Sequence, residues 1–445
     1  MHFLFFSRCQ KHPRLCRHGL SESMSKSRMA ARELTPPTPS ATEASVETIL
    51  DADYWRRLVP FLHLGELDRS ALGHAGGGPT GSPLDVEHLL QQRRMIVEDG
   101  YCVAATAAER GEDCAENLDQ LLVDKLAFAG SVLEYYGWPT TFLAIYDETW
   151  ALAQQCQDWM DRLTDAAAGK RVRNEFCMDI VGFNVVDGVG FSPHRDRQPE
   201  DWVPKGHADE NPRSTFDNGF ARYITCWVAL SDAHTGNSCL HYLSATADPG
   251  YWAGDSLNGD PMARAFGGTK NCAFQHIRAC PVKKGGMVAH THRVIHWGNQ
   301  GERDKTRLAL DWQRSGCAAT VDSATRGRST QRMHHVAQLI RSGALPHFAD
   351  QRALLKALRA LPPNPCRCAL SFSFSNNRGA SFEPPYLAAH HLPLPAFELR
   401  AAICAAQVPR DLPAHATVFV PGHDACLCTH ALLPAAMACI MQPLR

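Results

Sequence analysis

The sequence lacks the features that would assign it to several broad classes of protein. It has no apolar run close to the roughly 20 residues that a membrane-spanning helix needs. Neither sign of charge is in excess, since Lys+Arg 45 against Asp+Glu 46 gives a net charge of -1, so no strong field attracts nucleic acid or an anionic membrane. No internal repeat recurs at a fixed spacing, which excludes repeat arrays. These absences favour a globular protein whose partner is a small molecule, and they leave its oligomeric state open.

Regular cysteine spacing is also missing, although the chain contains 17 cysteines. Disulfide frameworks are typical of small secreted domains, so we predict reduced thiols and a cytoplasmic protein. The first 45 residues are basic, rich in Ser and Arg and poor in acid, as organellar transit peptides are. A mitochondrial or other organellar location therefore stays open. The alternatives for residues 1–45 are a disordered leader, or extra residues upstream of a start at Met24 or Met29.

The spacing of apolar residues divides the rest of the chain into a helical part and a β part. Helical spacing recurs over residues 46–66 and 115–168, and Asp51 is placed to cap the first helix. From about 175 to 315, short runs rich in Val, Ile, Phe, Tyr and Trp alternate with Gly, Asn, Asp and Pro. This texture is typical of an antiparallel sandwich or jelly roll. We predict one α+β domain over residues 46–316, with helices flanking a β core.

Two further segments receive more limited predictions. The run LDVEHLLQQRRMIVEDGYCVA (84–104) predicts a helix, a turn at EDG and a short strand at YCVA. Residues 317–445 are expected to form a C-terminal extension, partly helical and poorly defined. Within it, residues 365–445 are rich in Ala, Pro and Cys and show no clear period, so no structure is imposed on them.

The stretch FSPHRD (191–196) places a histidine and an aspartate two residues apart at the end of a β run. Residues i and i+2 of a strand face the same side, so His194 and Asp196 point together and Arg195 points away. One imidazole and one carboxylate are two ligands of the 2-His-1-carboxylate triad, which leaves open positions on Fe(II). The triplet alone is a weak signal, because a chain with 22 histidines forms such triplets by chance.

A third ligand would come from the run GGMVAHTHRVIHW, which holds His290, His292 and His296. A straight strand would place all three on one face, so periodicity does not choose among them. The next strand-like run, TRLALDW, follows the polar turn GNQGERDK, and a hairpin would return Arg307 beside His296. Arginine suits the distal carboxylate of a 2-oxoglutarate cosubstrate, because it forms bidentate, charge-assisted hydrogen bonds.

Over residues 90–315 the sequence resembles the phytanoyl-CoA dioxygenase family of Fe(II)/2-oxoglutarate oxygenases. Within that family it looks close to the branch of phytanoyl-CoA dioxygenase domain-containing proteins. The resemblance rests on SPHRD, on CWVALSDAHTGNSCLHYL and on VKKGGMVAHTHRVIHWGNQGERDKTRLAL. It implies a double-stranded β-helix of the jelly-roll or cupin type, with iron on His194, Asp196 and His296. It also implies 2-oxoglutarate on Arg307, flanked by Trp227.

The resemblance adds one weaker contact and shows two departures. Met178, on the strand that enters the site, is a further expected cosubstrate contact. The family often has HGS at the second histidine, where this chain reads HWGN, so Asn299 would have to replace the missing hydroxyl. The family's Pro-Gly-Ser-His turn is LSATADPG here. Because that loop lies near the pocket mouth, the substrate is not predicted.

The sequence therefore predicts a non-haem dioxygenase that uses Fe(II), 2-oxoglutarate and O2 to hydroxylate a small organic substrate, releasing succinate and CO2. Two alternatives belong to other classes. One is a catalytically silent β-barrel that binds a ligand or a protein, against which the complete set of ligands counts. The other is a cupin-like metal hydrolase or isomerase, which would have no use for Arg307.

Overall fold

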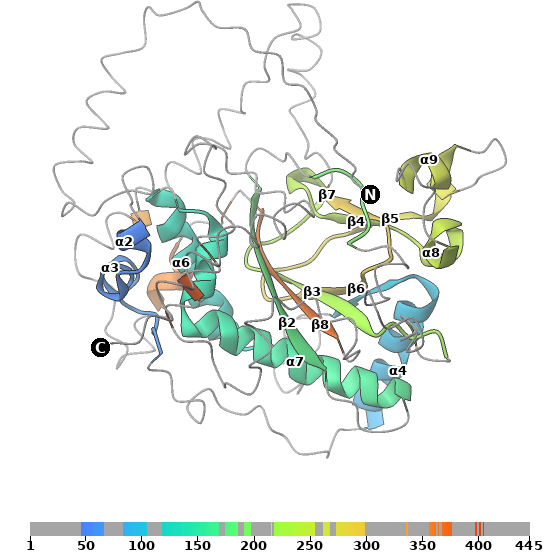
Figure 1. Cartoon of the computed structure of the whole chain (residues 1–445), viewed down its shortest axis with the longest axis horizontal. Coiled ribbons are helices and arrows are strands. Elements are labelled where there is room, and N and C mark those ends of the chain that lie inside the picture. The colour runs from blue at the N-terminus through green and yellow to red at the C-terminus, as the bar shows by residue number, and fades with distance from the viewer. Residues whose placement is uncertain are drawn as a thin grey trace, which may run out of the picture.

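The computed structural model places a set of helices against two antiparallel sheets (Figure 1). It describes residues 46–65, 83–104, 118–136, 138–168, 174–185, 191–196, 215, 218–253, 261–267, 273–298, 335–336, 356–361, 364, 367–375, 397, 400–401 and 404. The predicted leader, residues 1–45, lies outside them. Within the described residues, no helix combines the length and the apolarity that crossing a membrane requires.

The helices predicted over residues 46–66 and 115–168 are present, and so is the helix predicted within 84–104. The helical elements are α2 (Val46–Ile49), α3 (Ala52–Leu58), α4 (Pro83–Glu98), α6 (Gln120–Tyr135), the 3-10 helix η1 (Thr140–Ile145) and α7 (Asp147–Ala168). The predicted cap is present, because the Asp51 side chain accepts a hydrogen bond from the Asp53 backbone N–H. The strand predicted at YCVA is β1 (Tyr101–Ala104), which follows α4 after the turn at Gly100.

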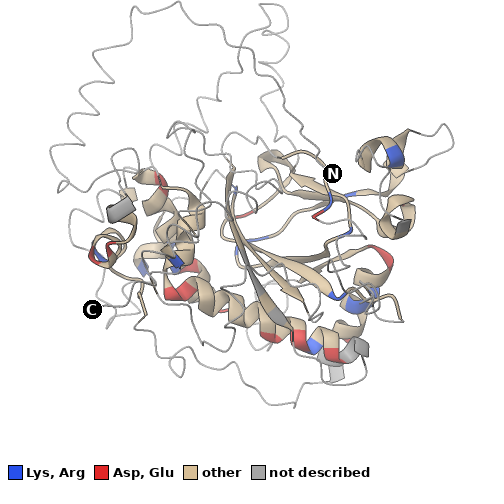
Figure 2. Cartoon of the chain, viewed as in Figure 1, with Lys and Arg blue, Asp and Glu red and all other residues tan. Residues whose placement is uncertain are grey.

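Helix α7 supports the larger sheet. Its buried residues recur three and four positions apart, as Leu152, Cys156, Trp159 and Leu163 show, so they form one apolar stripe. That stripe packs toward β2 and β8, while acidic residues follow the other side of the helix (Figure 2). The helix therefore shields the outer face of the sheet from water, and the opposite face is left for the site.

Two antiparallel sheets form the β part, which confirms a mixed fold of helices and antiparallel sheets. The strands are β2 (Glu175–Val185), β3 (Tyr223–Ala229), β4 (Leu240–Leu243), β5 (Ile277–Cys280), β6 (Met287–Thr291), β7 (His296–Gly298) and β8 (Arg367–Ser375). The larger sheet has the order β1-β6-β3-β8-β2 and the smaller one the order β5-β4-β7. Short helices α8 (Gly250–Ala253), α9 (Pro261–Phe266) and η5 (Ala273–His276) lie between β4 and β5 along the chain.

Strand β8 extends the β core beyond the range of 175–315 that the sequence predicts. It lies within the segment for which no structure was predicted, and it pairs with both β2 and β3. All nine of its residues are buried. The run TRLALDW, in which a strand was predicted, falls outside the described residues. The place of β8 in the sheet depends on pairing with strands that are distant in sequence, which local periodicity does not report.

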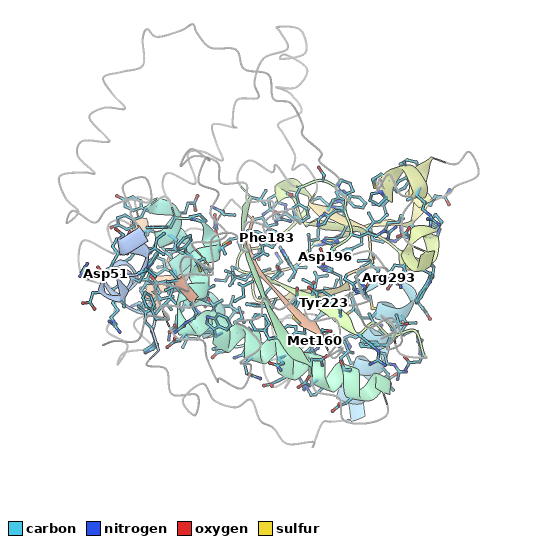
Figure 3. The ribbon with its side chains drawn as sticks, viewed as in Figure 1. Asp51, Met160, Phe183, Asp196, Tyr223 and Arg293 are labelled. Atoms are coloured by element: carbon cyan, nitrogen blue, oxygen red, sulfur yellow. The ribbon has the colours of Figure 1, made fainter. Side chains whose placement is uncertain are left out.

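Alternation along the strands separates two apolar clusters. On β3, Ile224, Cys226 and Val228 belong to the cluster beneath the helices, whereas Trp227 and Ala229 belong to the cluster between the two sheets. The labelled Asp196 lies between the sheets in Figure 3. The candidate site is therefore enclosed by β strands, with the helices on the far side of the larger sheet.

Candidate metal centre

Three of the predicted ligands converge between the two sheets. Nε2 of His194 and Nε2 of His296 each lie 3.6 Å from Oδ1 of Asp196. One donor atom from each of the three residues lies within 4.8 Å of the other two, so the group could hold a metal ion. Two imidazoles and one carboxylate that meet at one point match the donor set of a facial triad.

Backbone pairing brings these side chains together. His194 and His296 form an isolated antiparallel bridge, in which each N–H donates to the other residue's carbonyl at 3.0 Å. The two imidazoles therefore project from residues that lie directly opposite each other. Asp196 follows His194 by two residues and reaches the same side, as the strand period requires.

Hydrogen bonds to carbonyl oxygens set the orientation of both imidazoles. Nδ1 of His194 lies 2.9 Å from the carbonyl oxygen of Ser192, and Nδ1 of His296 lies 3.2 Å from that of Val294. A carbonyl only accepts, so the hydrogen of each neutral ring sits on Nδ1. Each Nε2 then keeps a free lone pair directed at the shared centre, which is the state a metal ligand needs.

The charges of the site also suit a cation. Burial by itself would raise the pKa of Asp196, but the histidines His296, His194 and His290 hold that pKa well below its ordinary value. Burial, together with the neighbouring His290, holds the pKa of His296 well below its ordinary value. Burial by itself would lower the pKa of His194, but the neighbouring Asp196 raises that pKa. Asp196 is therefore ionised and His296 neutral, and metal binding needs ligands in these states.

The structure separates the three histidines that periodicity could not rank. Strand β6 ends at Thr291, and the chain then crosses to the smaller sheet, where β7 begins at His296. His290 stays on the larger sheet and approaches the other oxygen of Asp196. His292 is buried near the carbonyl of Tyr223, 3.4 Å away. The three histidines do not share one straight strand, and His296 is the one that the geometry groups with His194 and Asp196.

Arg195 points away from the candidate metal ligands, as the strand period predicts. Its guanidinium is buried and forms two hydrogen bonds with the carboxylate of Asp248, at 2.5 and 2.8 Å. It also donates to the carbonyl of Arg293 at 2.5 Å. This ion pair ties the residue between the two ligands to the segment that begins α8, and so fixes the turn that presents them.

Breaking that pair is expected to destabilise the protein strongly. The substitution Asp248→Asn keeps the shape but leaves the Arg195 guanidinium buried without its anion, which costs about 3 kcal/mol of unfolding free energy. Urea denaturation measures the change. The matched control is Lys283→Ala, which removes an exposed pair with Asp232 at 3.2 Å and costs less than about 1 kcal/mol. Equal effects of the two substitutions would contradict an anchoring role for Arg195.

The structure describes only one side chain among the residues predicted to hold the cosubstrate, that of Trp227. Arg307 and Asn299 lie outside the described residues. Met178 lies on β2 within the register irregularity between Phe176 and Ile180, and its side chain is also outside what the structure describes. Trp227 is buried in the cluster between the sheets, and its Nε1 has no hydrogen-bond partner among the described atoms.

The sequence reasoning missed Arg367, the first residue of β8. Its side chain is fully buried, and Nη1 donates to the carbonyl of Ser238 at 2.5 Å. Nε and Nη2 have no hydrogen-bond partner among the described atoms. Its guanidinium lies 5.6 to 5.9 Å from the ring centres of Trp227, Phe191 and Phe183. Burial lowers its pKa to about 10, so the group remains a cation at neutral pH.

A signal for this strand exists in the sequence. In RCALSFSFS, residues 367, 369, 371, 373 and 375 are Arg, Ala or Ser, whereas the residues between them are Cys, Leu or Phe. That strict alternation is typical of a strand with one polar face. The pattern Arg-x-Ala-Leu, which begins the predicted strand at Arg307, recurs at Arg367. The sequence alone thus offers a second place for the cationic strand.

Comparisons with known proteins give likenesses of structure only. No family model matches the sequence, and neither does any curated protein. The solved epimerase SnoN, in complex with Fe3+, alpha ketoglutarate and nogalamycin RO, aligns with a TM-score of 0.36 and 15% identity, covering 71% of this chain and 96% of that one. AviO1 from Streptomyces viridochromogenes Tue57 aligns with a TM-score of 0.34 and 12% identity, covering 68% and 99%.

A third solved structure, the non-heme monooxygenase ThoJ in its nickel complex, aligns with a TM-score of 0.31 and 9% identity. It covers 64% of this chain and 76% of its own.

Proposed function

We propose that this chain is a non-haem Fe(II)- and 2-oxoglutarate-dependent dioxygenase that hydroxylates a small organic substrate. The observation that carries the proposal is the convergence of His194, Asp196 and His296 on one point between the sheets. A buried cation with unpartnered N–H groups lies between the same sheets. A metal site of this type and an anion-binding arginine are the two elements that such an enzyme requires.

The ligands present fit iron. Two neutral imidazoles and one carboxylate are a donor set that non-haem Fe(II) enzymes use, and it occupies only one face of the ion. When bound, Fe(II) and 2-oxoglutarate together supply O2 activation and the electrons for hydroxylation, with succinate and CO2 as by-products. The chain's own contribution is to hold the donor atoms in place. The Phe191 ring assists by packing against His194 and His296, at 5.2 and 6.2 Å between ring centres.

The buried donors fit a carboxylate. Unpartnered N–H groups of a buried arginine are costly, because each loses its water without gaining a partner. Nε and Nη2 of Arg367 form such a pair, and Trp227 adds a third unpartnered N–H under the same guanidinium. A carboxylate would satisfy Nε and Nη2 together through a bidentate, charge-assisted contact. We therefore assign the distal carboxylate of 2-oxoglutarate to Arg367, with Trp227 beside it, in place of Arg307.

The arrangement of strands supports the finer prediction of fold. Two antiparallel sheets face each other, and the segment before Asp196 pairs with β7 at the open edge of the smaller sheet. Alternate residues of the larger sheet point inward to a site between the sheets. We propose that this is a double-stranded β-helix of the jelly-roll type, as in the phytanoyl-CoA dioxygenase family that the motifs resemble.

Thermal unfolding with Mn(II) and N-oxalylglycine, a 2-oxoglutarate mimic that does not turn over, tests the proposal. We expect Mn(II) alone to raise the melting temperature and N-oxalylglycine to raise it further, but only when Mn(II) is present. Ligand at about 100 times its Kd adds about 2.7 kcal/mol to the unfolding free energy. Stabilisation by Mn(II) without any additional effect of N-oxalylglycine would favour a metal hydrolase or isomerase. No effect of either would favour a silent barrel.

A further inference from the structure

Asp196 uses its two carboxylate oxygens in different ways. Oδ1 faces Nε2 of both metal-ligating histidines. Oδ2 faces the larger sheet, where the Thr225 hydroxyl donates to it at 3.3 Å and Nε2 of His290 lies 3.3 Å away. The site therefore holds one oxygen toward the metal position and the other toward protein groups.

Strand register places those protein groups in one row. Thr225 on β3 pairs directly with His290 on β6 and, on its other side, with Ser373 on β8. The Thr225 and Ser373 hydroxyl oxygens lie 3.3 Å apart. Because directly paired residues share a face, this polar row crosses the larger sheet opposite Asp196. The row is thus part of the sheet framework and is positioned by the strand ladder.

The second ring nitrogen of His290, Nδ1, faces the smaller sheet. The hydroxyl of Tyr242, on β4, lies 3.0 Å from Nδ1 of His290. Tyr242 pairs directly with His296 on the neighbouring strand, and both Tyr242 and His290 are buried. His290 therefore lies between a phenol from the smaller sheet and the carboxylate of a metal ligand.

The chemistry of the three groups fixes the direction of their hydrogen bonds. A carboxylate only accepts hydrogen bonds, so a neutral His290 that donates to Oδ2 carries its hydrogen on Nε2. Its Nδ1 is then an acceptor. The Tyr242 phenol, whose ordinary pKa is about 10, keeps its proton at neutral pH and donates to it. Nε2 of His290 is buried and has no hydrogen-bond partner of standard geometry among the described atoms, and Oδ2 of Asp196 lies 3.3 Å from it.

We propose that Tyr242 and His290 form a relay that holds Oδ2 of Asp196 and so keeps this carboxylate a one-oxygen ligand. This inference rests on the metal site of the proposed function. A carboxylate free to rotate can offer both oxygens to a cation, and the second oxygen would then occupy a coordination position. By holding Oδ2, the relay leaves that position for the cosubstrate or O2. Tyr242 and His290 are positioning residues, since they act through Asp196.

Metal binding to purified full-length variants tests the relay. Mn(II) titration measures the affinity, and the visible absorption of bound Co(II) reports the coordination of the metal. His290→Leu removes the donor to Oδ2, and we expect Mn(II) affinity to fall about 10–100-fold, as for other groups that orient a ligand. The Co(II) spectrum is expected to change, because the number of oxygens on the metal changes. His290→Gln retains an N–H donor, so its affinity and spectrum are expected to lie closer to the wild type.

Two tyrosine variants separate the relay from simple packing. Tyr242→Phe removes only the hydroxyl that orients His290, and we expect Mn(II) affinity to fall at least several-fold. Tyr101→Phe is the matched control. The Tyr101 ring stacks on Tyr242 at 4.3 Å, but its hydroxyl is paired with Cys280. If His290→Leu does not fold, as judged by circular dichroism without metal, Tyr242→Phe carries the test alone.

The outcomes separate the relay from the proposed function. Wild-type metal affinity and an unchanged Co(II) spectrum in His290→Leu and Tyr242→Phe would overturn the relay alone. Equal losses in Tyr101→Phe and Tyr242→Phe would also overturn it, because packing would then explain both. A wild-type protein that binds Mn(II) but not N-oxalylglycine would overturn the dioxygenase and leave the relay supported by its own variants. Failure of the wild type to bind any metal would overturn both.

Discussion

Asp196→Ala is expected to abolish metal binding, and with it the conversion of 2-oxoglutarate to succinate. Asp196 supplies the only carboxylate of the described ligand group, and its pKa, held well below the ordinary value, keeps it ionised. Removing it leaves two imidazoles and no negative charge, so a divalent cation is attracted far less. The loss should exceed the roughly 10–100-fold that results from disturbing groups around a ligand.

Titration of Mn(II), followed by thermal unfolding, measures this loss directly. Asp158→Ala is a suitable control, because that carboxylate is exposed on α7 and far from the sheets' inner faces. Without metal, Asp196→Ala is expected to lose some stability, because the hydrogen bond that Thr225 donates to Oδ2 and the contacts of the carboxylate with the histidines are removed. A variant that retains wild-type Mn(II) affinity would mean that the metal lies elsewhere.

Arg367→Met is expected to remove N-oxalylglycine binding while leaving Mn(II) binding intact. The mimic's carboxylate would lose a charge-assisted contact worth about 1.5–3 kcal/mol, which corresponds to a loss of affinity of about 10–150-fold. Methionine keeps an apolar side chain of similar length between the rings of Trp227, Phe191 and Phe183. Calorimetric titration of the Mn(II)-loaded protein with N-oxalylglycine gives the affinity.

Arg307→Met is the matched control for this experiment, because the sequence motifs favour Arg307 whereas we propose Arg367. A selective loss in Arg307→Met would reverse our assignment. The stability of the two variants adds a second readout. Two N–H groups of Arg367 are unpartnered and buried, so Arg367→Met without ligands should lose no more than about 1 kcal/mol of unfolding free energy.

The relation of Arg307 to Arg367 illustrates where sequence reasoning stops. Both begin a run with the pattern Arg-x-Ala-Leu, and hairpin distance from His296 favoured the first. Strand β8 enters the sheet between β2 and β3, and no local rule relates it to strands so distant in the chain. Long-range pairing is decided by how whole faces of strands fit together.

Some features were predictable because their causes are local. The Asp51 cap, the apolar stripe of α7 and the strand at Tyr101 follow from propensity and period. The i, i+2 rule likewise placed His194 and Asp196 on one side and Arg195 on the other. The sequence by itself therefore determined the helices, most of the strands and, by strand period, two of the three candidate ligands, while the resemblance of its motifs pointed to the third, His296.

The tertiary structure decided what depends on contacts between the sheets. It separated His296 from His290, because the chain crosses from one sheet to the other between them. It also brought a buried arginine from β8 to Trp227 and the phenol of Tyr242 to His290. These pairs join residues far apart in sequence, and only the packing of one sheet on the other brings their atoms within reach.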